Sequence, residues 1–288
     1  FPFLKFFFWQ VIPRNTTKKE KEDFNKLKTK TFKNTESKGP LKTIFKMLKS
    51  IFQKRKKIDL SELQTDVHSH LIPGIDDGAK TMEQSIEMLL KFQEMGFKKV
   101  ITTPHILSDL YPNTPETILN GYQKVKEELK KQDVDITFEA AAEYFYDDHF
   151  LSEIEEDTVL KFHKNHVLFE FSFHTEPIQT EELFFKMQTK GLVPVLAHFE
   201  RYTYFREYIK IAEELREKGC LIQMNLNSLT GHYGPAIKKT AENLIKHKLV
   251  NLVGTDCHRL EHLHVLENNL EQAYFHKLLD LDLLNRSL

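Results

Sequence analysis

Two patterns alternate from Thr65 onward, and this alternation constrains the fold more than any other feature of the chain. Short apolar runs typical of buried strands are separated by amphipathic stretches with helical spacing. The predicted strands are 65–69, 99–103, 136–142, 166–171, 193–197, 221–225 and 250–255. The predicted helices include 81–95, 115–131, 180–190, 202–218 and 235–247. Such alternation predicts a parallel sheet with crossover helices.

Glycines mark the ends of three predicted helices. Gly96, Gly191 and Gly219 stand where helix C-caps belong. Seven strand–helix units are more than a small open sheet usually carries, and 288 residues suffice for a barrel of about 250 residues. We therefore predict the α/β class and a distorted (β/α)7 TIM-like barrel, with an open doubly wound sheet as the alternative.

The net charge of −1 hides two electrostatically different parts of the chain. Residues 1–57 contain 17 of the 41 Lys and Arg residues but 4 of the 42 Asp and Glu residues, which leaves 24 and 38 for residues 58–288. We expect a basic, flexible N-terminal extension over 1–57 and a catalytic domain over 58–288. The acidic balance of 58–288 argues against a nucleic-acid-binding surface.

Residues 41–57 have apolar side chains at helical spacing among lysine and arginine, a pattern of a basic amphipathic helix. A solvated or loosely docked helix is the favoured interpretation, and peripheral contact with an anionic membrane surface is the other. No run approaches the roughly 18 to 20 apolar residues of a membrane-spanning helix. Two cysteines give no disulfide framework and fit a reducing compartment. We therefore expect a cytoplasmic protein, held at the inner membrane surface if residues 41–57 bind lipid.

Metal-binding residue types recur where the predicted strands end. His68 and His70 are two residues apart on the first run, so their side chains share one face. The candidates on the later runs are His105, Glu143, Glu170, His198, Asp256 and His258. Because the carboxyl ends of barrel strands meet at one rim, these side chains are predicted to converge. Run 221–225 has no clear ligand, although Asn225 and Asn227 are polar groups in the right place.

This set exceeds the need of one catalytic zinc ion, which takes three protein ligands and a water. Two or three divalent ions are predicted. Imidazole and carboxylate ligands without thiolate suit Mn, Fe or Zn. Clustered ions acidify a water and neutralise charge on a phosphoryl oxygen, so the pattern indicates hydrolysis.

Six motifs resemble, in this order, the polymerase and histidinol phosphatase (PHP) family: DVHSHLIPGIDDGAK, TPH, AAEYF, EFS, AHFERY and TDCHR. More narrowly they look like its bacterial tyrosine-protein phosphatases of the capsule and exopolysaccharide type, over residues 64–270. The resemblance implies a trinuclear, usually manganese-dependent centre in a distorted (β/α)7 barrel. It also implies hydrolysis of phosphotyrosine on the tail of a bacterial tyrosine autokinase by a metal-activated hydroxide.

The same resemblance assigns roles to individual residues. The implied ligands are His68, His70, Asp77, His105, Glu143, Glu170, His198, Asp256 and His258. Arg201 is expected to grip the phosphate, where a bidentate guanidinium is better suited than Lys, and His198 and Asp256 complete the catalytic set. Phe199 replaces a usual proline and is expected to reshape the cleft. Cys257 also departs from the family pattern, and neither change removes a ligand.

The two cysteines do not form the active site of a cysteine-based phosphatase. Cys220 and Cys257 lack the arginine that a cysteine-based tyrosine phosphatase needs six residues on, since Leu226 and Leu263 stand there. A small phosphomonoester such as histidinol phosphate, or a nucleic-acid 3′ end, remains an alternative substrate, and a non-catalytic kinase-binding scaffold is disfavoured by the intact ligand set. The candidate walls for an aromatic substrate are Tyr144, Tyr202, Tyr204 and Tyr233.

Overall fold

The computed structural model describes residues 56–178 and 180–288. Every pairing between its named strands is parallel. The strands are β1 (Thr65–Asp66), β2 (Lys99–Thr102), β3 (His105–Ile106), β4 (Thr137–Ala140), β5 (Glu143–Phe145), β6 (His166–Glu170), β7 (Val193–Leu196), β8 (Leu221–Asn225) and β9 (Leu252–Gly254). Their orders are β1-β2-β4 in one sheet and β3-β5-β6-β7-β8-β9 in the other.

The two sheets are parts of one curved surface. The second predicted strand, 99–103, forms β2, and the chain returns to the sheet as β3 after Pro104, which has no N–H for the ladder. Pairing with the next run continues across the gap, since Ala141 N donates to Thr102 O at 2.9 Å and Glu143 N to Pro104 O at 3.0 Å. Each of the seven predicted runs contains one strand, whereas β3 and β5 lie just beyond the predicted runs 99–103 and 136–142 and continue them.

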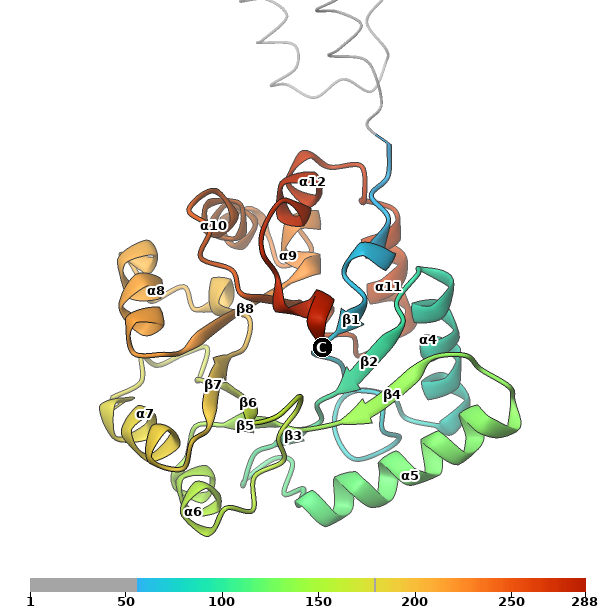
Figure 1. The fold of residues 1–288 in the computed structure, drawn as a ribbon, viewed down its shortest axis with the longest axis horizontal. Coiled ribbons are helices and arrows are strands. Elements are labelled where there is room, and N and C mark those ends of the chain that lie inside the picture. The colour runs from blue at the N-terminus through green and yellow to red at the C-terminus, as the bar shows by residue number, and fades with distance from the viewer. Residues whose placement is uncertain (1–55, 179) are drawn as a thin grey trace, which may run out of the picture. The chain divides into compact units, whose positions relative to one another are not determined.

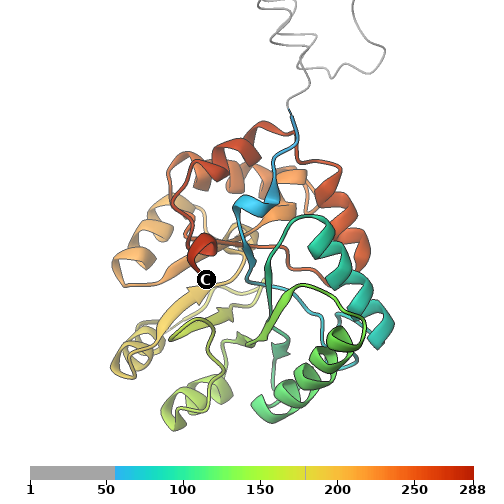
Figure 2. The ribbon, with the colours of Figure 1, turned by 45° about the vertical axis from the view of Figure 1, so that its right-hand side comes forward.

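The first and last strand runs meet and close the barrel. Asp256 N donates to His68 O at 2.8 Å, and His70 N donates to Cys257 O at 2.9 Å. Ser69 and Cys257 form a parallel bridge between them. Figures 1 and 2 show the helices outside the strands. The predicted α/β barrel is confirmed, and the open sheet is wrong.

The side chain of Asn285 contributes to closure at the amino ends of β1 and β9. Asn285 lies in the 3₁₀ helix η3 (Leu284–Ser287), and its Nδ2 donates to Thr65 O at 2.8 Å and Val253 O at 2.7 Å. Its Oδ1 accepts a hydrogen bond from Val253 N at 2.9 Å. The chain accordingly ends beside β1 (Figure 1). The Asn285 side chain therefore forms hydrogen bonds with backbone groups of β1 and β9 at this end of the two strands.

The helices surround the barrel. They are α4 (Met82–Glu94), α5 (Pro115–Lys131), α6 (Asp148–Glu156), α7 (Thr180–Thr189), α8 (Tyr208–Glu217), α9 (Leu226–Thr230), α10 (Pro235–Lys246), α11 (Leu260–Glu267) and α12 (Ala273–Leu279), with 3₁₀ helices η1 (Leu60–Glu62) and η2 (Phe199–Arg201). The five predicted helices are present, and Gly96, Gly191 and Gly219 have the positive φ of helix ends. The helix predicted at 202–218 begins only at Tyr208, because residues 202–207 form a loop.

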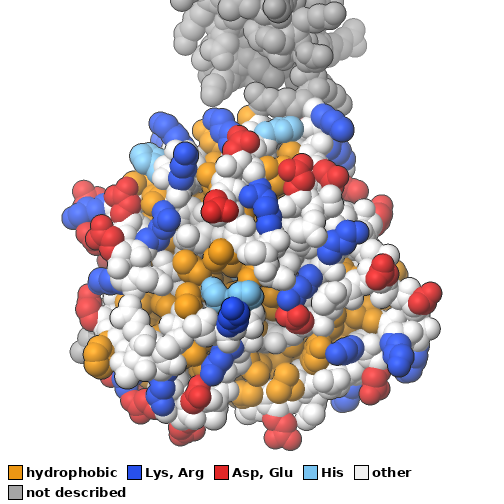
Figure 3. Space-filling model, in the orientation of Figure 1, with side chains coloured by type: hydrophobic (Ala, Val, Ile, Leu, Met, Phe, Trp, Pro, Cys, Tyr) orange, Lys and Arg blue, Asp and Glu red, His pale blue; other side chains and the backbone are white. Residues whose placement is uncertain are grey.

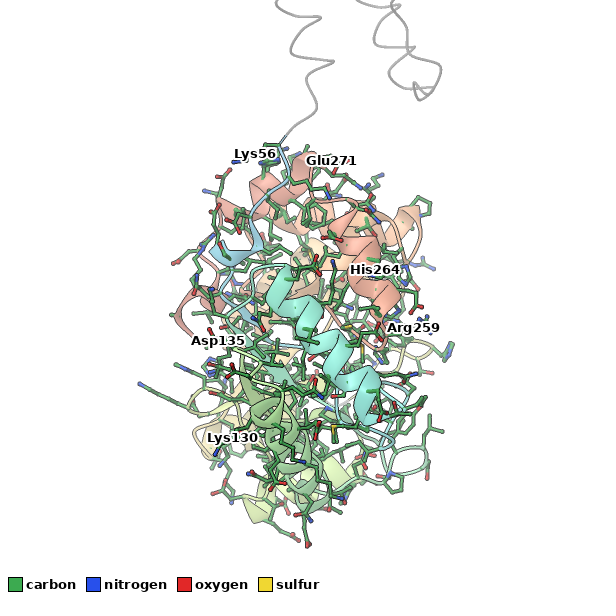
Figure 4. All side chains as sticks on the ribbon, turned by 90° about the vertical axis from the view of Figure 1, so that its right-hand side faces the viewer. Lys56, Lys130, Asp135, Arg259, His264 and Glu271 are labelled. Atoms are coloured by element: carbon green, nitrogen blue, oxygen red, sulfur yellow. The ribbon has the colours of Figure 1, made fainter. Side chains whose placement is uncertain are left out.

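Figure 4 shows the two ends of the barrel from the side of α4. This helix contacts α5 and α11. Asp135, before β4, and Arg259, after β9, lie on opposite sides of the view. Among the described residues, no helix is both long and apolar enough to cross a bilayer. Residues 1–55, and with them nearly all of the predicted basic extension and its helix at 41–57, lie outside the described residues.

Two apolar layers position the site. The cluster inside the barrel comprises Val67, Ile101, Ala141, Phe162, Leu168, Val195, Ala197 and Leu252, and the larger cluster lies between strands and helices. Glu143 and Glu170 follow interior residues by two positions, so they share the inward face one step nearer the carboxyl rim. Figure 3 shows the face of the molecule on which the chain ends, beside β1. Hydrophobic side chains lie near the middle of this face, among charges of both signs.

Candidate metal centre

His68 and His70 lie fully buried where the first run meets the last. Their Nε2 atoms are 3.3 Å apart, which confirms that the two side chains share a face. Gly254 on β9 makes room for this approach, because a Cβ there would lie 2.5 Å from His68 Cβ. The absence of a side chain at position 254 thus lets His68 enter the barrel mouth.

Glu143 is the central carboxylate of the site. Its Oε2 lies 3.1 Å from His68 Nε2 and 3.2 Å from His105 Nδ1, and its Oε1 lies 2.9 Å from His198 Nε2. Glu170 lies beside it, 3.4 Å from His105 Nδ1 and 3.5 Å from His198 Nε2. Histidines from three other strand runs therefore surround this pair of carboxylates.

A second group of contacts involves Asp256. Its Oδ1 lies 3.5 Å from Nε2 of both His68 and His70 and 3.3 Å from His258 Nδ1. His258 Nε2 in turn lies 3.2 Å from Oδ1 of Asp77, whose side chain is 52% exposed. Asp77 therefore joins the cluster from its solvent side.

The donor atoms fit more than one cation. Four overlapping groups have ligand atoms all within 4.8 Å of one another: His68/His70/Asp256, His68/Glu143/His198, His105/Glu143/Glu170 and His70/Asp77/His105/His258. They contain all the ligands that the sequence predicts. Within the described residues, the buried Nδ1 of His198 has no hydrogen-bond partner. Clustered imidazole and carboxylate donors suit divalent ions, so the residues present fit a polynuclear metal centre.

The electrostatics of the cluster agree with this assignment. Burial raises the pKa of Glu143, but His68 and His105 outweigh burial and hold the pKa well below its usual value. Burial lowers the pKa of His198, but hydrogen bonds with Glu143 and Glu170 raise it to about 9. The low pKa of Glu143 means that this buried carboxylate is ionised and needs positive partners. Bound metal ions would supply that positive charge, with the histidines as neutral ligands.

Asp76 is a site residue that the sequence analysis missed. Its Oδ2 lies 2.8 Å from His70 Nδ1, and its Oδ1 accepts a hydrogen bond from Gly78 N at 2.9 Å. Asp76 therefore holds the His70 ring from behind, as carboxylates behind metal-binding histidines commonly do. The adjacent Asp77 contacts His258 in the cluster itself. The only sequence signal for these two roles, one acid behind His70 and one in the cluster, is that two aspartates stand side by side in the motif.

Strand β8 supplies positioning groups instead of ligands. Gln223 Oε1 accepts a hydrogen bond from His198 N at 2.8 Å and lies 3.2 Å from His68 Nδ1. Gln223 Nε2 donates to Asn225 Oδ1 at 3.0 Å, and Asn225 Nδ2 donates to Asp256 Oδ2 at 2.7 Å. Asn225 is thus a group of the site, as the sequence analysis suggested. Gln223, two residues earlier on the same face of β8, is a second such group. Asn227 instead donates to His262 O at 3.0 Å.

Replacing Gln223 with methionine should lower the affinity for Mn²⁺ about 10- to 100-fold, because the His68 ring loses the partner that orients it. Titration of metal-free protein with Mn²⁺ measures this. The surface variant Gln132→Met is the matched control and should bind as wild type does. Unchanged affinity in Gln223→Met would remove Gln223 from the support of the centre.

Arg201 lies at the edge of the cluster, on η2. Its Nη1 donates to Asp256 Oδ2 at 3.0 Å. The guanidinium carbon lies 4.3 Å from the ring centre of Phe173 and 4.6 Å from that of Tyr233. Contact with two rings and a carboxylate fixes the guanidinium beside the metal-binding residues.

Left-handed backbone occurs at two residues of this site. His198 has φ 33° and Asp256 has φ 52°. At His198 this conformation ends β7 and begins η2. Such conformations are costly for side chains other than glycine and are often found at functional sites. In this site the left-handed residues are themselves ligand candidates, and the turn at His198 leads into η2, which contains Arg201.

Phe199 and Cys257 both lie away from the metal ligands. Phe199 is buried in the core and its ring lies 5.6 Å from that of Phe205, so the expectation that it reshapes the cleft is wrong. Cys257 Sγ lies 3.6 Å from Met88 Sδ on α4, and burial raises the pKa of its thiol. As predicted, Cys257 points away from the cluster.

The four candidate tyrosines separate into two groups. Tyr144 and Tyr202 are buried, and their hydroxyl oxygens accept hydrogen bonds from Leu160 N and Phe171 N. Their interpretation as substrate walls is wrong, because core packing uses both rings. Tyr204 and Tyr233 are partly exposed, and Tyr233 contacts Arg201.

A parallel α/β barrel with a His, Asp and Glu cluster at its carboxyl rim, flanked by an arginine, defines a metal-dependent hydrolase. The family model described as "Capsular polysaccharide synthesis, CpsB/CapC" matches residues 64–271. This chain belongs to the CpsB/CapC family.

Named relatives support this assignment. The chain is 31% identical over 201 residues to the tyrosine-protein phosphatase YwqE of Bacillus subtilis, which covers 68% of this chain and 78% of YwqE. It is 28% identical over 202 residues to the tyrosine-protein phosphatase CpsB of Streptococcus pneumoniae, which covers 68% of this chain and 83% of CpsB.

A solved structure agrees with the sequence relatives. The fold is similar to a chain from the crystal structures of YwqE from B. subtilis and CpsB from S. pneumoniae, described as metal-dependent tyrosine phosphatases. The TM-score is 0.66 at 28% identity, over 75% of this chain and 91% of that one.

Proposed function

We propose that this protein is a metal-dependent protein-tyrosine phosphatase. The observation that carries the proposal is the contact of Arg201 with Asp256, which puts a phosphate-binding guanidinium at the edge of a polynuclear ligand cluster. Relatives of the chain bear the name tyrosine-protein phosphatase. When bound, the ions supply an acidified water and neutralise charge on the phosphoryl oxygens.

The chain's own residues hold and orient the reactants. Glu143 and Glu170 join the histidines of neighbouring strands, while Asp256 holds both the cluster and Arg201. We assign binding of the phosphoryl oxygens to Arg201. His198, which contacts Oε1 of Glu143, is the third residue of the proposed catalytic set, with Arg201 and Asp256. The donor set suits two or three Mn²⁺ ions, with Fe or Zn as alternatives.

For the substrate we propose a phosphotyrosine-bearing protein, the tail of a bacterial tyrosine kinase in capsule or exopolysaccharide synthesis. Family membership and the names of the relatives support this choice. A cytoplasmic location follows from such a substrate. A solvated helix stays the favoured interpretation of residues 41–57, and in the alternative, contact with an anionic membrane, each Lys or Arg contributes about 1 kcal/mol.

A chelator should abolish turnover of a phosphotyrosine peptide, and added Mn²⁺ should restore it, whereas Cys257→Ser should retain most of the activity. The reason is that the cluster supplies every catalytic group and the buried thiol faces Met88. Turnover of histidinol phosphate, measured in parallel, should be much slower. An inactive Cys257→Ser protein together with indifference to chelator would refute the mechanism, and faster turnover of histidinol phosphate would favour the small-substrate alternative.

Removal of residues 1–46 should change turnover of a small phosphotyrosine substrate by less than about threefold, a barrier change below about 1 kcal/mol. All the proposed ligands lie after residue 67, so the deletion leaves the centre intact. Steady-state kinetics of the two proteins test whether residues 1–46 lie outside the catalytic domain. Co-sedimentation with anionic and neutral vesicles tests residues 41–57, and equal partitioning to both would leave this segment a solvated leader.

A further inference from the structure

Phe173 is an aromatic residue of the barrel rim to which the sequence analysis gave no role. It follows the end of β6 by three residues and is partly exposed, whereas Phe169 and Phe171 before it are buried in the core. Its ring centre lies 4.3 Å from the Arg201 guanidinium carbon and 5.1 Å from the His198 ring. Phe173 is thus in contact with both the expected phosphate-binding residue and a metal ligand candidate.

The position of Arg201 decides where a substrate's organic group lies. Within the described residues, the guanidinium donates a hydrogen bond only to Asp256 and contacts the rings of Phe173 and Tyr233. A phosphoryl group held between the ligand cluster and Arg201 therefore has its ester substituent next to these rings. The substituent leaves the centre past an aromatic surface.

An aryl substituent fits such a surface better than an alkyl one. Aromatic rings pair favourably at centroid separations of 4.5 to 7 Å in edge-to-face or offset arrangements. The Phe173 ring is stacked on the buried Tyr202 ring, at a centroid separation of 5.7 Å and an interplanar angle of 28°. This contact on the core side fixes the orientation of the Phe173 ring. A held ring loses little side-chain entropy when a second ring packs on it.

We propose that Phe173 is a specificity-determining residue that selects aryl over alkyl phosphomonoesters by packing against the substrate ring. This inference rests on the proposed phosphatase function and deepens it. Tyr233 contacts the same guanidinium, with its ring centre 4.6 Å from the guanidinium carbon.

The test compares two peptides of one sequence, with phosphotyrosine or phosphoserine, in Mn²⁺-loaded enzyme. In Phe173→Leu the ratio of kcat/KM for phosphotyrosine to that for phosphoserine should fall about tenfold, equivalent to about 1.4 kcal/mol. Phe173→Tyr keeps a ring and should keep the ratio. The matched control is Phe185→Leu on α7, where the side chain is 71% exposed, and its ratio should equal that of wild type.

Inhibition provides a readout that does not need turnover. Phenylphosphonate should lose about tenfold in affinity for Phe173→Leu, whereas methylphosphonate should bind both proteins alike. Equal losses for both peptides would show that Phe173 only positions Arg201, and an unchanged ratio would show no role, so either result overturns the inference while the phosphatase function stands. A wild-type enzyme without preference for phosphotyrosine would instead refute the proposed function.

Discussion

Replacing His68 with alanine is expected to lower kcat for a phosphotyrosine peptide about a thousandfold or more, equivalent to about 4 kcal/mol of barrier. His68 Nε2 lies near Glu143, Asp256 and His70 at once, and the residue belongs to two of the four candidate ligand groups. Loss of this one ring therefore weakens the binding of two ions. The content of Mn²⁺ per chain should fall together with kcat.

The variant should remain folded, because the apolar clusters inside and around the barrel contain other residues. Circular dichroism and mass spectrometry of bound metal separate loss of metal from loss of fold. The control is His149→Ala on α6, where the side chain is 47% exposed and lies 3.9 Å from Glu153, which belongs to none of the candidate ligand groups. Full metal content and activity in His68→Ala would contradict the assignment.

The barrel could be predicted because strands buried on both faces give continuous apolar runs that differ sharply from the helices between them. The details of closure could not. The hydrogen bonds of Asn285 to Thr65 and Val253 join residues far apart in sequence, and a lone asparagine near a chain end gives no sign of them. Short helices such as α9 and α12 have too few turns to show a period.

The clustering of the candidate ligands could be predicted because strand ends fix where side chains meet and because the motifs name the residue types. Supporting residues depend instead on side-chain geometry. Gln223 reaches two ligand candidates from a strand without ligands of its own. Phe173 is one of 23 phenylalanines, nearly all of which could equally belong to the core. Only contact with Arg201 distinguishes it.

Replacing Arg201 with lysine is expected to lower kcat about 100- to 1000-fold, the usual cost of losing one preorganised donor to a developing oxyanion. Lysine keeps the charge but has neither the planar fork for bidentate phosphate binding nor the flat surface that contacts Phe173 and Tyr233. Steady-state kinetics with a phosphotyrosine peptide give kcat and KM separately. The larger loss should be in kcat, since charge on the phosphoryl oxygens grows in the transition state.

Metal binding distinguishes this effect from a damaged centre. Asp256 Oδ2 still accepts a hydrogen bond from Asn225 Nδ2 at 2.7 Å when Arg201 is lost, so Asp256 keeps its orientation and Mn²⁺ content should stay that of wild type. Arg206→Lys, at an exposed position of the same loop, is the matched control and should be fully active. A kcat within threefold of wild type in Arg201→Lys would show that the guanidinium serves only to hold Asp256. A low kcat at full metal content places Arg201 on the phosphoryl group itself.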